Sequence, residues 1–253
     1  MAAGGEPGSA LLTRLEYIQS LPSYFTGSFR QTWATLGRPN DFDTVGPCPV
    51  ALIPGAFCTS SVMNRLGAAI ETRGRSVAVT PSFPYYLSAF ANLCRLDLAA
   101  TAAARWLDAL GVRLGIEQVD VAAHSNGGLI ALLAQAKIDA GQVRSQVSIR
   151  RLVTMATPFG GMPGARMLGL LLPCCRDLVD GADSLRLAKI GGDRVARCLV
   201  SAADSLVPPS RQSLDADRRS LMEGYQHMDF IVGTEERVNR TAAEVVRWLN
   251  DAC

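Results

Sequence analysis

A serine among small residues is the first place in this chain where side-chain types suggest chemistry. The segment reads Ala123-His124-Ser125-Asn126-Gly127. A run typical of a buried strand, 119–123, precedes the serine, and apolar residues at helical spacing follow it over 129–133. An abrupt turn from strand to helix strains the turn residue, requires small neighbours, and points helix N–H groups at whatever the serine attacks. The pattern predicts a nucleophilic Ser125.

A serine hydroxyl is a weak nucleophile at neutral pH and needs a base within hydrogen-bond reach. The chain has only two histidines. His124 lies on the strand that approaches the turn, and we expect it to point away from Ser125. His227 follows the last predicted strand and remains as the base.

The base needs an acid that fixes its tautomer. Asp204 directly follows an apolar strand, 194–200, at the sheet edge where Ser125 is also expected. It is therefore the predicted acid. Six other aspartates are assigned elsewhere, three to a cap, two to a polar connection and one to a helix cap: Asp177, Asp180, Asp183, Asp215, Asp217 and Asp229.

The segment around Ser125 resembles the nucleophile elbow of α/β-hydrolases, particularly bacterial lipases and esterases. Ala123 stands where the usual pattern has Gly, as also occurs in small lipases of the Bacillus type. The resemblance covers about residues 48–253. It implies an α/β fold with a mostly parallel central sheet, helices on both faces, and the triad order Ser125, Asp204, His227. It also implies acyl transfer through an acyl-enzyme, with no cofactor and no metal.

Two loops carry further parts of this resemblance. Pro54-Gly55-Ala56-Phe57 follows the first predicted strand and resembles the loop that donates an oxyanion N–H in lipases, with Pro54 in place of His. Ala56 and Asn126 are thus the expected oxyanion donors. Thr157-Pro158-Phe159-Gly160 resembles a Thr-Pro-His-Gly corner near the site, to which we assign shape rather than chemistry. We expect Phe57, Phe159 and Leu170 to contact the substrate.

Alternating periodicities set out the elements around these residues. The expected strands are 50–53, 76–80, 118–123, 149–155, 194–200 and 218–223, and the expected helices are 61–72, 96–114, 127–140 and 233–249. We expect an N-terminal tail and helical extension over 1–45 and a hydrolase domain over 46–253. Within that domain, 162–192 is either a small lid or a buried helix of the main body. An aromatic loop at 81–86 either lines the acyl pocket or covers the sheet.

Composition limits the classes of function. Of 253 residues, 48% are apolar and 19% charged, which suits a large folded core. The net charge of +2 gives no support for nucleic-acid binding. The seven cysteines are odd in number and have no metal-ligand spacing, so we expect reduced thiols. With no secretory signal and no membrane span, the expected location is cytoplasmic.

The expected function is hydrolysis of a small-molecule ester or lipid, with transient contact to a lipid surface and an oligomeric state that the sequence leaves open. A thioesterase, phospholipase or acyltransferase would use the same triad. A different class, a catalytically weak hydrolase-like binding protein, also remains. In a third alternative, 10–36 and 162–192 are contact surfaces for protein or membrane.

Overall fold

Six parallel strands form the centre of the computed structural model, which describes residues 48–79 and 94–250. The order across the sheet is β2-β1-β3-β4-β5-β6, and every neighbouring pair is parallel. The strands are β1 (Val50–Ile53), β2 (Val77–Val79), β3 (Gln118–His124), β4 (Ser148–Met155), β5 (Val195–Val200) and β6 (Arg219–Leu221). Strand β1 is wholly apolar and buried, and every residue of β3 after Gln118 is buried, as expected for strands covered on both faces.

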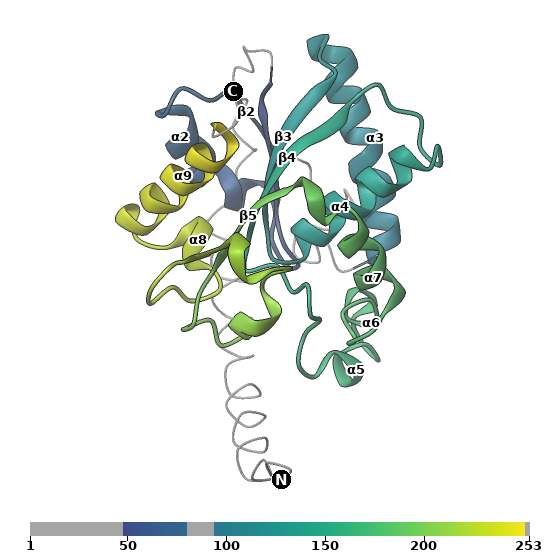
Figure 1. Cartoon of the computed structure of the whole chain (residues 1–253), viewed down its shortest axis with the longest axis vertical. Coiled ribbons are helices and arrows are strands. Elements are labelled where there is room, and N and C mark those ends of the chain that lie inside the picture. The colour runs from purple at the N-terminus through teal and green to yellow at the C-terminus, as the bar shows by residue number, and fades with distance from the viewer. Residues whose placement is uncertain (1–47, 80–93, 251–253) are drawn as a thin grey trace.

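Helices cover both faces of the sheet (Figure 1). On one face lie α3 (Leu96–Leu114), α4 (Asn126–Asp139) and α7 (Asp183–Ile190). On the other lie α2 (Asn64–Glu71), α8 (Asp229–Val232) and α9 (Glu235–Asn250). The remaining helical segments are short: η1 (Ser60–Met63), α5 (Ala165–Leu168), α6 (Pro173–Arg176), η3 (Gly192–Arg194), η4 (Pro209–Arg211) and η5 (Ala216–Arg218).

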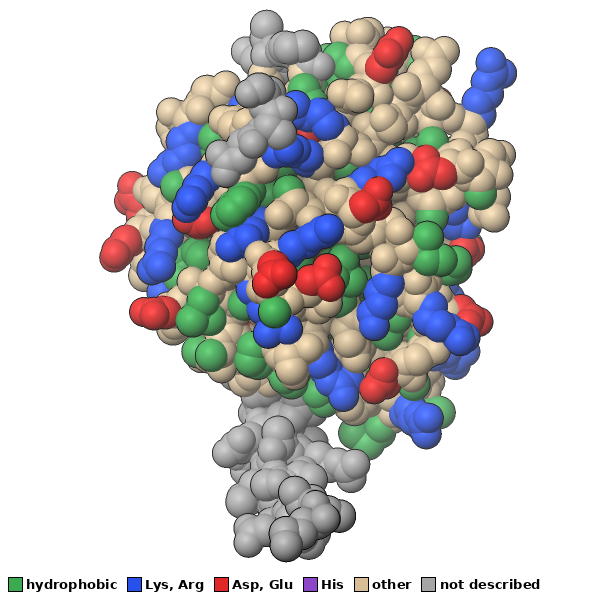
Figure 2. All heavy atoms as spheres, in the orientation of Figure 1, with side chains coloured by type: hydrophobic (Ala, Val, Ile, Leu, Met, Phe, Trp, Pro, Cys, Tyr) green, Lys and Arg blue, Asp and Glu red, His purple; other side chains and the backbone are tan. Residues whose placement is uncertain are grey.

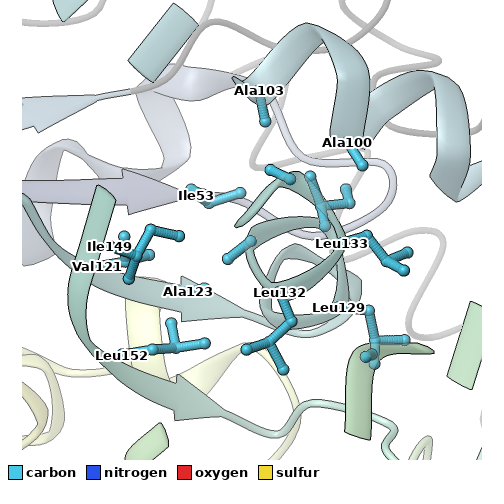
Figure 3. Packing of buried hydrophobic residues seen from close by; sticks show 14 of the residues in the cluster. Ile53, Ala100, Ala103, Val121, Ala123, Leu129, Leu132, Leu133, Ile149 and Leu152 are labelled. Carbon is cyan, nitrogen blue, oxygen red and sulfur yellow. The ribbon is translucent and has the colours of Figure 1, made fainter. Parts of the chain in front are cut away.

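Helix α4 is the most deeply buried helix, because α3 and the sheet enclose it. Figure 3 shows Leu129, Leu132 and Leu133 of α4 among strand side chains and the alanines of α3. Small residues on α3, such as Ala100 and Ala103, allow the two helices to approach closely. This packing holds the first turn of α4, which follows Ser125, in a fixed position.

Most of the expected elements are present. The predicted bounds of β1 and α3 are those observed, and the apolar faces predicted for α2 and α9 are buried. The predicted helix 61–72 instead begins as η1, and α8 was not expected. The predicted N-terminal extension and the aromatic loop 81–86 lie outside the described residues. The predicted division into 1–45 and 46–253 remains a prediction.

Segment 162–192 contains the buried helix that was one of the two structures predicted for it, and the lid remains a prediction. Leu185 and Ala188 of α7 belong to the core beside α4, so this helix is part of the main body. The stretch 165–176 instead forms α5 and α6, which pack on each other away from the sheet (Figure 1). The regular helix of α7 begins only at Asp183.

The face of the molecule drawn in Figure 2 shows no marked separation of charge. Figure 2 shows basic and acidic side chains interspersed over one face, in keeping with the net charge of +2. The six cysteines in the described part of the chain are free thiols. Among the described helices, none combines the length and apolarity needed to cross a bilayer.

Candidate active site

Ser125 occupies the turn between β3 and α4 with a backbone φ of 54°. A positive φ is unfavourable for a residue with a Cβ atom, and such strain is held only where surrounding contacts enforce it. Two hydrogen bonds do so. The Ser125 N–H donates to the Met155 carbonyl at 2.8 Å, and the Thr157 hydroxyl donates to the Ser125 carbonyl at 2.8 Å.

Three glycines make room for this turn. A Cβ atom on Gly127 would lie 2.5 Å from the Ile53 carbonyl oxygen, and one on Gly128 would lie 2.3 Å from Thr157 Oγ1. A Cβ atom on Gly55 would lie 2.7 Å from Ser125 Cβ. These three positions therefore require glycine, because α4 and the loop after β1 lie too close to their neighbours to leave room for a side chain.

The structure brings Ser125, His227 and Asp204 into one hydrogen-bonded series. His227 Nε2 lies 3.0 Å from Ser125 Oγ, and His227 Nδ1 lies 2.8 Å from Asp204 Oδ2. A carboxylate can only accept, so Nδ1 carries the proton and Nε2 presents its lone pair to the serine hydroxyl. All three side chains are buried, although they come from loops 23 and 79 residues apart.

Asp204 is held in its ionised form. Burial opposes ionisation, but His227 and the hydrogen bonds to the carboxylate outweigh it, so the pKa of Asp204 is lowered. Its Oδ1 accepts the N–H groups of Leu206 and Val207 at 2.9 and 3.0 Å. An ionised acid in this position favours the His227 tautomer that a general base requires.

Gln212 stabilises the loop that carries Asp204, and sequence reasoning missed it. Its side chain is fully buried, accepts the Ser201 N–H at 2.9 Å, and donates to Asp204 Oδ2 at 3.3 Å and to the Val207 carbonyl. Thr157 was missed as well, because the Thr-Pro corner was assigned shape alone. For Thr157 the signal available was a polar residue after a largely apolar stretch, whereas Gln212 lies among other polar residues and gave no signal.

His124 does not contact Ser125 through any described hydrogen bond; it contacts the other histidine. Its Nε2 lies 2.7 Å from the backbone carbonyl oxygen of His227, and the two ring centroids are 4.8 Å apart. Burial, and after it the neighbouring His227, lowers the pKa of His124 to about 3. The ring is therefore neutral at ordinary pH.

A cavity with about 480 Å³ of empty space, part of it open to solvent, lies beside Ser125. Its polar lining residues are Ser125 and Asn126, and none of its lining residues is charged. The others are apolar or cysteines: Ala56, Phe57, Pro158, Met162, Leu168, Leu172, Cys174, Cys175, Leu178, Leu206 and Val207. Both expected oxyanion residues, Ala56 and Asn126, thus border the same cavity as the serine, and Asn126 begins α4.

Two of the three expected substrate-binding residues lie elsewhere. Phe57 lines the cavity, but the Phe159 ring is fully buried in the core beside α4. Leu170 is 77% exposed on the outside of the α5–α6 segment and does not reach the cavity. Pro158 and Met162 occupy the wall where Phe159 was expected, because the chain turns Phe159 inward after the proline.

The other aspartates lie outside this series. Asp177, expected in the cap, is buried, accepts the Leu96 N–H at the start of α3 and pairs with Arg95 at 2.7 Å. Asp229, expected as a helix cap, is instead the first residue of α8, and its carboxylate accepts the Gln226 N–H before the helix at 2.7 Å; the N-cap residue is Met228. Over residues 48–79 and 94–250, no cluster of three His, Cys, Asp or Glu side chains is arranged to hold a metal ion.

A parallel sheet, a strained serine between strand and helix, and a His–Asp pair at the carboxyl ends of the strands together define the α/β-hydrolase fold. The chain has this fold and resembles lipases and esterases of known structure. No protein-family model matches the chain, and no curated protein sequence matches it.

Solved structures match over most of the chain at low identity. A lin2722 gene product from Listeria innocua has a TM-score of 0.59 and 14% identity, over 82% of this chain and 96% of that one. Lipase B of Aspergillus fumigatus has a TM-score of 0.56 and 15% identity, over 86% and 66%. The NocB thioesterase domain, in a covalent complex with a fluorophosphonate nocardicin G analogue, has a TM-score of 0.51 and 16% identity, over 81% and 96%.

Proposed function

We propose that this protein is a serine hydrolase that cleaves carboxylic esters with an apolar acyl group. The observation that carries the proposal is the series Asp204–His227–Ser125, which ends at a cavity with apolar walls. The similar solved structures, which include lipases, a lipase-esterase related protein and a thioesterase domain, support hydrolysis as the class of reaction.

The mechanism follows from the hydrogen bonds. Ser125 Oγ donates its proton to His227 Nε2 as it attacks the ester carbonyl, and Asp204 stabilises the imidazolium. The backbone N–H groups of Ala56 and Asn126 are the proposed donors to the oxyanion. His227 then protonates the leaving alcohol, and water that His227 deprotonates releases the acid from the acyl-enzyme.

The cavity favours an uncharged acyl group. A charged substrate group would lose hydration against walls that offer it no opposite charge. A hydrocarbon acyl chain instead gains from burial, by about 25 cal/mol per Å² of apolar surface. The proposed substrates are therefore esters of apolar carboxylic acids.

Labelling with an alkyl fluorophosphonate tests the activated serine. We expect stoichiometric labelling of the wild type, none in Ser125→Ala, and labelling slowed by about 10⁴-fold or more in His227→Ala and Asp204→Asn. Ser205→Ala removes an exposed serine beside Asp204 and should label at the wild-type rate. If the folded wild-type protein fails to label, the proposal that it is an enzyme is contradicted and the alternative of a binding protein is favoured.

Hydrolysis of p-nitrophenyl esters from acetate to palmitate then measures the acyl preference. We expect kcat/KM to rise as apolar carbons are added until the cavity is filled, and succinate monoesters to be poor substrates. Matched thioesters of the preferred acid test the leaving group. A marked preference for the thioester would assign the chain to thioester hydrolysis instead.

A further inference from the structure

We infer that His124 is a positioning residue for the general base: it holds the backbone of His227 so that the imidazole faces Ser125. This inference rests on the proposed function, since it concerns how the same site is assembled. His124 is the last residue of β3 and directly precedes the nucleophile. Two adjacent residues would therefore fix the positions of both the serine and its base.

The hydrogen bond defines the chemistry of His124. A carbonyl oxygen can only accept, so His124 Nε2 carries the proton that is donated to the His227 carbonyl across 2.7 Å. In a neutral ring Nδ1 is then a lone pair. Among the described residues no group hydrogen-bonds to this buried Nδ1, which lies beside the main chain of Gly55.

This hydrogen bonding excludes a role for His124 as a second general base beside His227. Protonation of Nδ1 would create a buried N–H⁺ without a described acceptor, next to the ring that becomes imidazolium during catalysis. Removal of the Nε2 proton would break the bond to His227. The ring therefore contributes as a fixed neutral donor.

His227 needs such support because it lies in the loop between β6 and α8 rather than on a long element. Strand β6 has three residues and α8 has four. Another bond reaches the same loop, from the Ser201 hydroxyl to the Tyr225 carbonyl at 2.6 Å. The His124 bond acts on the main chain of the base itself, where a displacement of about 1 Å can lower a rate by about 100-fold.

Two substitutions separate the hydrogen bond from the ring. His124→Phe keeps an aromatic ring but removes the donor, and we expect kcat to fall by about 100-fold with little change in KM. His124→Gln keeps an amide N–H at a similar distance from the backbone and should recover most of that loss. Gln135→Leu is the control, because Gln135 is a buried polar residue of α4 whose bond to the Ile149 N–H lies in the core away from the cavity. It should lower the unfolding temperature without changing kcat.

Proton NMR provides a readout that does not depend on turnover. The chain has two histidines, so each ring can be assigned by comparison with His124→Gln. We expect the downfield N–H signal of His227 bonded to Asp204 to be kept in His124→Gln and lost or shifted in His124→Phe. The ring of His124 should show no protonation between about pH 5 and 8.

Four outcomes would overturn the inference. The first two concern turnover: a folded His124→Phe with the kcat of the wild type, or a loss of kcat in His124→Gln while His124→Phe stays active. The other two concern the NMR spectra: a His227 signal that is unchanged in His124→Phe, or protonation of His124 near neutral pH. Failure of the proposed function is a separate result, because wild type would then not label with fluorophosphonate although the NMR signals could still be compared.

Discussion

Two histidines lie side by side in this site, and their partners assign them different roles. His227 has a carboxylate at Nδ1 and a hydroxyl at Nε2, so it can gain and lose a proton while its surroundings compensate. His124 has a carbonyl at Nε2 and no described partner at Nδ1, so protonation is strongly opposed. Residue type alone would not separate these roles.

At the scale of the residue, we expect His124 to make the protein sensitive to acid. Its pKa is about 3 in the folded state against 6.5 as the ordinary value. The unfolded chain therefore binds the additional proton between these values, and stability that is present above pH 6.5 is lost as the pH falls towards 3. At pH 5 the loss from this residue is about 2 kcal/mol.

The comparison of wild type with His124→Gln isolates this effect, because Asp204 and His227 remain in both. Urea unfolding at pH 7 and pH 5 measures it. The wild type should lose about 2 kcal/mol more stability than His124→Gln over this range. Equal losses in the two proteins would show that His124 is protonated in the folded state.

At the scale of the element, the β3–turn–α4 unit depends on how closely α4 approaches the end of β1. The space at Gly127 is limited by the backbone oxygens of Ile53 and Pro54, at 2.5 and 2.8 Å from where a Cβ atom would stand. Backbone atoms cannot rotate away as a flexible side chain can. The glycine therefore couples the position of α4 to the loop that holds Ala56.

Gly127→Ala should consequently lower stability by about 1–3 kcal/mol and slow fluorophosphonate labelling, because the added methyl group pushes α4 away from this loop. Gly191→Ala is the matched control. Its Cβ atom would meet Leu132 Cδ2 at an ordinary 3.4 Å, and its φ of −83° suits alanine. Thermal unfolding and labelling rates measure both. Normal labelling in Gly127→Ala would show that the turn tolerates the shift.

At the scale of the whole molecule, one end of the sheet carries the proposed catalytic residues and the other end carries a buried ion-pair cluster. Asp120 lies near the start of β3, at the opposite end of the strand from Ser125, and is fully buried. It forms ion pairs with Arg75 and Arg150, each at 2.6 Å. Arg150 also donates to the Leu249 carbonyl at 3.2 Å, so the cluster connects β3, β4 and the segment before β2 to the end of α9.

Removing the charge of Asp120 should destabilise the protein without changing its chemistry. Asp120→Asn leaves two arginines without a counter-charge, and we expect a loss of about 3 kcal/mol. Asp183→Asn breaks an exposed pair with Arg186 within α7 and should cost about 0.5 kcal/mol or less. Urea unfolding measures both, and the labelling rate of folded Asp120→Asn should equal that of wild type. A slowed rate would contradict the separation of the two ends.

The parts of the fold that depend on local periodicity and on chain order could be predicted from the amino-acid sequence. Strand β1, helix α3 and the strand-turn-helix at Ser125 could be predicted because burial on one or both sides leaves a periodic apolar pattern. The sequence also led to Ser125, Asp204 and His227, since only two histidines and one suitably placed aspartate were available. Their roles in catalysis remain proposals.

The directions in which individual side chains point could not be predicted, because they depend on how distant segments pack. Phe159 and Leu170 are apolar residues in the expected segments, yet one is in the core and the other is exposed. His124 and Gln212 belong to the site through bonds to backbone groups 103 and 11 residues away. Periodicity records whether a residue is buried, but a hydrogen bond between distant loops depends on how those loops meet, and a single sequence carries no local pattern for that.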